Sequence, residues 1–236
     1  MTRITIACLD MAGTTVRDDG TVLAAFNAAV GQAGLASGTP ERDRAMEIVH
    51  AMMGNSKIDV FRRILGDEDA AARANRSFEE HYAVAVRTGQ VSAMPGAEQT
   101  ITGLRAAGVQ VCLLTGFSPA TRDAILDALG WRPLIDLALS PADAGRGRPW
   151  PDLPLTALLR LGGESVRDLA VLGDTPSDVE SGLRAGAGLV AGVLTGRATR
   201  GDLERAGAPL ILDSVTDLPA HLNARRRIRD TEDLYA

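Results

Sequence analysis

The chain has 236 residues, a length that suits one large α/β domain or a core with a smaller inserted domain. Its hydrophobic content of 45 % and charged content of 23 % are typical of a soluble globular protein. The formal net charge of −5 excludes the basic footprint of a nucleic-acid binder. No apolar run approaches the ~20 residues of a membrane span, and the N-terminus lacks a secretory signal pattern. We therefore expect a cytoplasmic protein without membrane or nucleic-acid partners.

The first predicted element is an apolar, β-rich run at residues 4–9, which indicates a buried parallel strand. No strand pattern follows between about residues 21 and 94. Helical patterns fill this segment at residues 22–33, 42–53, 58–65 and 67–87. The turn residues of SAMPG, positions 92–96, mark the return of the chain. We expect a helical insert at residues 21–94, spliced in after the first strand.

Strand and helix patterns alternate in the remainder of the chain. Apolar runs predict strands at residues 109–114, 169–172, 189–193 and 210–212. Helical patterns fall at residues 98–107, 119–129, 151–161 and 176–185. This order predicts an α/β fold with a doubly wound parallel sheet, built from residues 1–20 and 95–236. The charged tail, residues 223–236, is expected to fray or dock loosely.

Two residue types are scarce enough to interpret one by one. Cys8 and Cys112 lie in apolar, strand-like runs and are interpreted as buried thiols, not as a disulfide or metal site. Lysine and arginine together number 25, but Lys57 is the only lysine. A codon bias toward arginine explains this scarcity without any function. However, lysine can release its proton and act as an amine nucleophile, and arginine cannot.

Polar residues follow three predicted strands, at the edge where parallel sheets bind ligands. A carboxylate at Asp10 is placed to attack phosphorus, and Thr115 with the backbone N–H groups after Asp10 suits phosphoryl oxygens. Asp174 and Asp178, together with Asp10, offer the hard oxygen ligands that Mg²⁺ prefers. Arg148 adds a planar cation that stabilises charge during transfer. Together these residues predict a phosphoryl-transfer site.

Each of these signals also has a simpler interpretation. DTPSD, residues 174–178, fits a capped helix start. Thr115 with Gly116 fits an ordinary strand exit, and Arg148 fits a loop charge in water. Asp10 is more specific, because an acid directly after a buried strand is costly without a function. The ordered set is far less expected by chance than any of its members.

The motifs LDMAGTT, LLTGFS, GRGRPWPDL and LGDTPSDVESGLRAG, in this order, resemble the haloacid dehalogenase superfamily across essentially the whole chain. The resemblance implies a Rossmannoid core, a helical cap at residues 21–94 and a small phosphonate or phosphate substrate. It also allows a homodimer through the cap, while the sequence leaves monomer or dimer open. It implies the catalytic residues Asp10, Thr115 and Arg148, with Mg²⁺ held by Asp10, Ala12 (through its backbone carbonyl), Asp174 and Asp178. The residues expected to contact substrate are Ala12, Gly13, Thr14, Met53, Gly116 and Phe117.

Ala12 narrows the expected chemistry. In the superfamily's usual phosphatases an aspartate at this position protonates the leaving alkoxide, a contribution of ~10²–10⁴-fold. DMAGTT, GRPWPD and MGNSKID (residues 53–59) resemble the phosphonatase branch, whose Schiff-base lysine falls on Lys57. The resemblance implies cleavage of the C–P bond of phosphonoacetaldehyde or a related oxo-phosphonate. Asp10 attacks phosphorus, and an imine on Lys57 accepts the C–P electrons, so no acid at position 12 is needed.

The chain departs from the phosphonatase pattern at three positions. Val60 stands where the pattern has histidine, Phe117 where it has tyrosine, and Thr21 is the nearest counterpart of a cysteine. His50 is a candidate substitute for the histidine, although a non-catalytic role fits it equally well. Met53 either dries the pocket of Lys57 or fills the core.

Two other functions stay open on the sequence alone. One is a phosphomonoesterase that acts on a small phosphorylated metabolite with a good leaving group, with Lys57 only binding it. The other is a binding or regulatory protein that keeps the phosphate pocket without turnover. The intact set of Asp10, Thr115, Arg148, Asp174 and Asp178 argues against the last.

Overall fold

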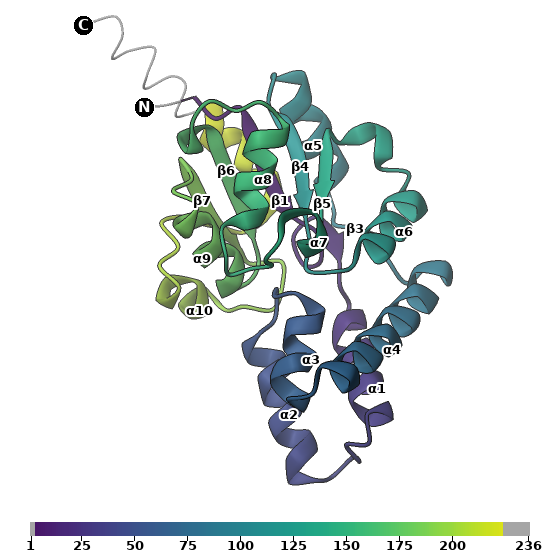
Figure 1. The fold of residues 1–236 in the computed structure, drawn as a ribbon. Helices are drawn as coiled ribbons and strands as arrows, with labels where there is room; N and C mark the ends of the chain where they lie inside the picture. Colours follow the sequence, from purple (N-terminus) through teal and green to yellow (C-terminus); the bar gives the residue numbers. More distant parts are fainter. Residues whose placement is uncertain (1–2, 224–236) are drawn as a thin grey trace, which may run out of the picture.

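The computed structural model describes residues 3–223 and contains a six-stranded parallel sheet in the order β5-β4-β1-β6-β7-β8 (Figure 1). Its strands are β1 (Ile6–Asp10), β4 (Gln110–Leu114), β5 (Leu137–Leu139), β6 (Leu169–Gly173), β7 (Leu189–Val193) and β8 (Ile211–Leu212). Every residue of β1 is buried, as expected for a central strand covered on both faces. The expected parallel α/β sheet is confirmed.

Helices cover both faces of this sheet (Figure 1). They are α5 (Ala97–Ala106), α6 (Pro119–Leu129), α7 (Pro141–Ala144), α8 (Asp152–Arg160), α9 (Pro176–Arg184) and α10 (Arg200–Arg205). Alternate side chains of β1 point to opposite faces: Ala7 and Leu9 join the apolar cluster that contains α5 and α6, whereas Ile6 and Cys8 join the cluster that contains α8. The core is therefore a three-layer α/β/α arrangement.

Local signals fix where the helices of the core begin and end. Ser118 caps α6, because its Oγ accepts a hydrogen bond from the backbone N–H of Thr121, and Pro119 occupies the first helical position. Gly130 ends α6 in the left-handed conformation, with φ 67°. Helix α6 thus starts just after the end of β4, which places its N-terminus beside the Thr115 segment.

The four helices inserted after β1 form a separate layer at the end of the sheet where Asp10 lies (Figure 1). They are α1 (Thr21–Gln32), α2 (Pro40–Ala51), α3 (Lys57–Leu65) and α4 (Glu68–Arg87), and we call them the cap helices. An aromatic cluster of Phe26, Phe61, Phe78 and Tyr82 packs α1, α3 and α4 together, and Phe117 of the core joins it. The ring centres of Tyr82 and Phe117 lie 4.5 Å apart.

The chain leaves and re-enters the core through a two-stranded antiparallel ribbon. Its strands are β2 (Val16–Arg17) and β3 (Ser92–Ala93). The expectation that residues 21–94 contain no strand is therefore wrong at β3, which has only two residues and no readable period. Strand β5 and the short helices α7 and α10 were also not predicted, for the same reason of length. All predicted strands and helices are found, and their observed ends lie within two residues of the predicted ends.

Other expectations can be checked against the described residues. Cys8 and Cys112 are paired positions of β1 and β4, and both are buried free thiols, as predicted. None of the helices within residues 3–223 combines the length and apolar character needed to cross a bilayer. The charged tail from residue 224 onward lies outside the described residues.

Candidate active site

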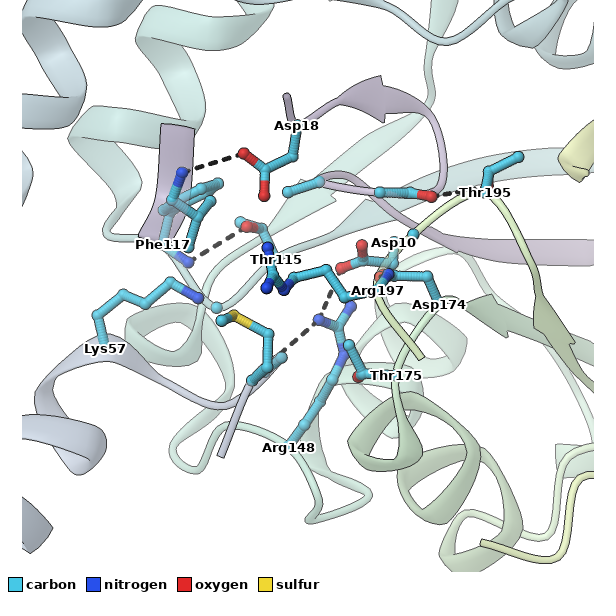
Figure 2. Close-up of a pocket in the computed structure, with 17 residues that line it drawn as sticks. Asp10, Asp18, Lys57, Thr115, Phe117, Arg148, Asp174, Thr175, Thr195 and Arg197 are labelled. Carbon is cyan, nitrogen blue, oxygen red and sulfur yellow. Dashed lines mark hydrogen bonds and ion pairs between the residues drawn. The ribbon is translucent and has the colours of Figure 1, made fainter. Parts of the chain in front are cut away.

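A cavity of about 350 Å³ lies between the ends of the strands and the cap helices (Figure 2). Most of the predicted site residues line it: Asp10, Ala12, Gly13, Met53, Lys57, Thr115, Gly116, Phe117, Arg148 and Asp174. Asp178 is buried behind the cavity, in an ion pair with Arg148. Thr14 is buried but does not line the cavity, and its Oγ1 has no hydrogen-bond partner within residues 3–223.

The turn after Asp10 brings backbone close to Asp174. Backbone N–H groups of Thr14, Thr15 and Val16 converge on the carbonyl oxygen of Met11. Gly13 adopts φ 93°, and a Cβ there would lie 2.6 Å from Asp174 Oδ2. Glycine is therefore required both by the backbone conformation and by the close approach.

Arg148 joins two buried carboxylates. Its Nη1 lies 2.7 Å from Asp10 Oδ1, and its Nε lies 2.8 Å from Asp178 Oδ1. The side chains of all three residues are almost completely buried. Removing one partner would leave an uncompensated charge in a dry environment, which is strongly unfavourable. Arg148 therefore fixes the orientation of the Asp10 carboxylate.

Asp10, Asp174 and Asp178 form a buried acidic cluster in which one carboxylate oxygen of each residue lies within 4.8 Å of the other two. Burial raises the pKa of Asp10 to about 7, against the opposing effect of Arg148, and burial with the like charge of Asp10 raises the pKa of Asp174 as well. Asp174 Oδ2 accepts a hydrogen bond from the backbone N–H of Arg197, but Oδ1 has no partner among the described residues. Such a cluster could hold a metal ion, and its hard oxygen donors fit Mg²⁺.

The residues at the start of α9 both cap that helix and contribute to the acidic cluster. Asp178 Oδ2 accepts hydrogen bonds from the backbone N–H and the hydroxyl of Thr175. Its other oxygen faces Arg148. The capped-helix interpretation of DTPSD is therefore confirmed, and it is compatible with the predicted acidic site.

Lys57, the first residue of α3, points into the cavity and is only 7 % exposed (Figure 2). Its Nζ lies 5.0 Å from the ring centre of Phe117 and 5.8 Å from that of Phe26. Burial lowers the pKa of the Lys57 amine, while the negative charge of Asp10 acts in the opposite direction. The environment therefore favours the neutral, nucleophilic amine more than water does.

The segment that carries Lys57 is docked tightly on the core. The hydroxyl of Ser177 donates to Asn55 Oδ1 at 2.5 Å, and the backbone N–H of Lys57 donates to the carbonyl of Gly116 at 3.2 Å. A Cβ on Gly116 would lie 2.3 Å from the carbonyl oxygen of Asn55, and one on Gly54 would collide with Thr175. Glycine at positions 54 and 116 permits this approach.

The residues that differ from the phosphonatase pattern can now be placed. Val60 and Phe117 are buried and apolar. His50 is exposed in the last turn of α2 and does not line the cavity, so nothing in its position supports a substitute role. Met53 both lines the cavity and packs against the main apolar cluster, so its two interpretations do not exclude each other.

Sequence reasoning missed several residues of the cavity wall, chiefly Asp18, Thr195 and Arg197. Thr195 follows the end of β7, so the strand-end rule used for Thr115 had the signal to find it; its hydroxyl donates to the carbonyl of Gly13 at 2.7 Å. The Arg197 guanidinium forms no hydrogen bond or ion pair with any described residue. Asp18 belongs to the connection between core and cap, where no local pattern marked it.

The family model for haloacid dehalogenase-like hydrolases matches residues 4–186, so the chain belongs to this family of hydrolases. Among curated relatives, phosphonoacetaldehyde hydrolase of Pseudomonas putida is 30 % identical over 141 residues, which cover 59 % of this chain and 50 % of that protein. The Bordetella pertussis enzyme of the same name is 29 % identical over 182 residues, covering 67 % and 65 % respectively.

Solved structures show the same architecture. A hydrolase from Pseudomonas syringae matches with a TM-score of 0.80 and 26 % identity, over 93 % of this chain and 98 % of that one. A phosphonoacetaldehyde hydrolase-like protein from Oleispira antarctica matches with a TM-score of 0.79 and 24 % identity, over 96 % and 94 %. The second likeness shows the fold alone. The matched region spans about half to two thirds of the curated relatives, so their activity is not transferred directly.

Proposed function

We propose that the protein is a Mg²⁺-dependent hydrolase that cleaves the C–P bond of phosphonoacetaldehyde or a related oxo-phosphonate. The observation that carries the proposal is the position of Lys57. The side chain of the chain's only lysine is buried in the same cavity as Asp10, and Ala12 stands where an acid would otherwise assist a leaving oxygen. An electron sink on the amine accounts for both features.

The reaction would begin on the amine of Lys57. Because the pKa of this group is lowered by burial, a larger fraction is neutral near pH 7 than for a lysine in water. The neutral amine would attack the substrate carbonyl and, with loss of water, form a protonated imine. The aromatic rings of Phe26 and Phe117 near Nζ keep a cation at this position tolerable.

The carboxylate of Asp10 would then attack phosphorus. The C–P bond breaks, its electron pair moves into the protonated imine to give an enamine, and phosphorus is left as an aspartyl phosphate. Water would hydrolyse the aspartyl phosphate, and protonation of the enamine followed by hydrolysis would release the carbonyl product. No alkoxide leaves from phosphorus, so the reaction needs no acid at position 12, where alanine stands.

The phosphoryl group would be held by groups of the core. Thr115 Oγ1 accepts a hydrogen bond from the backbone N–H of Phe117 at 3.2 Å, so its hydroxyl proton is available to a phosphoryl oxygen. Arg148 offsets negative charge next to Asp10. Asp10, the Ala12 carbonyl, Asp174 and Asp178 would hold Mg²⁺, which lowers the repulsion between an anionic nucleophile and an anionic substrate.

The proposal assigns different roles to two parts of the chain. Residues 1–20 and 95–236 form the catalytic core, and residues 21–94 form the cap. The β2–β3 ribbon, with Gly20 at φ 89° and Gly96 at φ 78°, joins the two parts and supports a hinge at this place. Closure of the cap helices would bring Lys57 to the substrate and exclude water. A small-molecule substrate in the cytoplasm and a homodimer through the cap stay predictions.

Borohydride reduction in the presence of phosphonoacetaldehyde tests the proposal. The wild-type protein should be trapped as an N-alkylated lysine that peptide mass mapping locates at Lys57. Lys57→Arg keeps the positive charge but cannot form an imine, so it should lose both trapping and phosphate release. Its circular dichroism spectrum and unfolding midpoint serve as controls for folding.

The alternative function gives the opposite pattern. A phosphomonoesterase would release phosphate from phosphate esters in both the wild type and Lys57→Arg, with no trapped lysine. Asp10→Asn should abolish phosphate release in either case, because both routes use the same carboxylate. A protein without turnover would release no phosphate from any substrate tested with Mg²⁺.

A further inference from the structure

Imine formation on Lys57, on which this inference rests, requires a group that carries protons. The ammonium form of lysine has three protons, and the protonated imine keeps one. The other two leave on the water derived from the carbonyl oxygen. In an enclosed site these transfers from nitrogen to oxygen need a side chain that accepts and returns a proton. The chain lacks the histidine and tyrosine that the phosphonatase pattern has, since Val60 and Phe117 stand in their places.

The described residues that line the cavity offer few candidates. The ionisable side chains among them are Asp10, Asp18, Lys57, Arg148, Asp174 and Arg197. Asp10 and Asp174 belong to the acidic cluster, and Asp10 is also the nucleophile. Arginine does not give up its proton in proteins. Asp18 is the carboxylate of this wall that no other part of the reaction uses.

Asp18 is held in position by the start of the cap. One carboxylate oxygen accepts a hydrogen bond from the backbone N–H of Val22 in α1 at 3.0 Å. Figure 2 shows the other oxygen turned toward the side of the cavity where Thr115 lies. Within the described part of the chain, no ion pair joins Asp18 to Lys57, so their charged atoms are more than 4.0 Å apart. Both residues line the same cavity, and the negative charge of Asp18 acts to raise the pKa of the Lys57 amine.

We propose that Asp18 is the proton carrier of imine formation and imine hydrolysis on Lys57. Its carboxylate takes a proton from the ammonium form of Lys57, which frees the amine to attack, and gives that proton to the carbonyl oxygen as the C–N bond forms. It then takes a second proton from nitrogen and gives it to the departing hydroxyl group, which leaves as water while the nitrogen lone pair forms the C=N bond. Asp18 ends as a carboxylate, and hydrolysis reverses these transfers.

Other ionisable groups near Lys57 fit this role less well. Glu79 on α4 already accepts hydrogen bonds from Ser118 and Thr121, so its carboxylate holds the start of α6. Tyr82 has a buried hydroxyl without a partner in residues 3–223, but it does not line the cavity, and burial raises the pKa of its hydroxyl.

The test compares Asp18→Asn with Asp19→Asn. Asparagine at position 18 still accepts the bond from Val22 but cannot carry a proton. Asp19 is the neighbouring exposed residue, paired with Arg17, and its variant changes the net charge equally. The readouts are the rate of borohydride trapping with phosphonoacetaldehyde and the exchange of the carbonyl oxygen with isotopically labelled water. We expect both rates to fall about 100-fold in Asp18→Asn and less than about threefold in Asp19→Asn.

Two further measurements separate a proton carrier from a structural residue. Formate added to Asp18→Asn should restore part of the trapping rate, because a free carboxylate can occupy the vacated place, and Asp18→Glu should retain more activity than Asp18→Asn. Should Asp18→Asn fold poorly, Asp18→Ser keeps a helix-capping oxygen and takes the same formate test.

The outcomes separate the role of Asp18 from the imine mechanism on Lys57. Trapping of Asp18→Asn at the wild-type rate would overturn the role of Asp18 and leave the lysine mechanism intact. A slow Asp18→Asn that formate does not rescue and that Asp18→Glu does not improve would also overturn it, in favour of a structural role. If the wild type itself is never trapped, the proposed C–P chemistry fails, and the role of Asp18 fails with it.

Discussion

The Nζ of Lys57 lies 5.0 Å from the ring centre of Phe117, inside a cavity whose opposite wall carries the acidic cluster. This places an amine from the cap helices beside a strand-end residue of the core, across the boundary between the two layers. Lys57 and Phe117 therefore connect the cap helices to the proposed reaction, because water is excluded from the amine only while Phe117 and the cap helices enclose it. Four predictions follow from this arrangement and its neighbours.

The buried amine should make the protein less stable near neutral pH than a variant without it. Because the pKa of Lys57 in the folded protein is below its ordinary 10.5, the unfolded chain binds more protons between those two values. Stability therefore rises with pH across this window, and the cost is full below it. Each unit of lowered pKa corresponds to about 1.4 kcal/mol.

Lys57→Met, which is close in size but uncharged, should accordingly show a larger free energy of unfolding than the wild type at pH 7. The difference should shrink as the pH rises toward 10.5. Urea denaturation of both proteins at several pH values measures it, and other titrating groups cancel in the difference. A gap that is independent of pH would mean that Lys57 is not desolvated in the folded protein.

Metal binding should matter most where the acidic cluster is fully charged. Burial raises the pKa of Asp10 to about 7, above its ordinary 3.8, so the metal-free folded protein binds more protons than the unfolded chain between these values. Its stability should fall as the pH rises from about 4 to 7. Mg²⁺ should restore stability above pH 7, by about 2.7 kcal/mol at a concentration of 100 times Kd.

Asp174→Asn provides the matched comparison for the metal. Removing one negative charge should stabilise the metal-free protein and weaken its response to Mg²⁺, as measured by calorimetry with and without EDTA. An unfolding midpoint that responds to Mg²⁺ equally in both proteins would show that Asp174 does not hold the ion.

The guanidinium of Arg197, which has no partner in the described part of the chain, should contribute to binding of an anionic substrate. Its backbone is fixed by the hydrogen bond to Asp174, and its side chain lines the cavity. A hydrogen bond to a charged group is worth about 1.5–3 kcal/mol, and exposure reduces this value. We expect Arg197→Gln to raise KM by about tenfold with a small change in kcat. Arg200→Gln, at the exposed start of α10, is the control and should leave both constants unchanged.

Docking of the cap segment should depend on the absence of a side chain at position 116. A Cβ there would lie 2.3 Å from the carbonyl oxygen of Asn55, so Gly116→Ala must displace the segment that carries Lys57. Borohydride trapping should become slower, and KM should increase. Gly103→Ala in α5 meets no atom within 4 Å and should stabilise the protein by about 0.5–1 kcal/mol. Unchanged trapping in Gly116→Ala would mean that the cap loop tolerates a different position.

The strand-end residues were predictable because their signal is local. An apolar run followed by Asp10, Thr115 or Asp174 is visible in a few residues, and parallel strands end at one edge of the sheet, so the three had to converge. Lys57 was found by a short motif rather than by periodicity. Asp18 and Arg197 were missed because nothing within a few residues of either indicates that a hinge and a loop fold over the same cavity.

By itself the sequence determined the alternation of strands and helices, the capped start of α9 and the set of reactive groups, since periodicity and capping act over a few residues. Only the tertiary structure decided which of these groups are buried away from water and which form ion pairs. Arg148 is shared between Asp10 and Asp178, the guanidinium of Arg197 has no partner among residues 3–223, and Lys57 is shielded from water by rings from both layers. Desolvation and charge pairing depend on distances between residues far apart in the chain, and folding alone sets those distances.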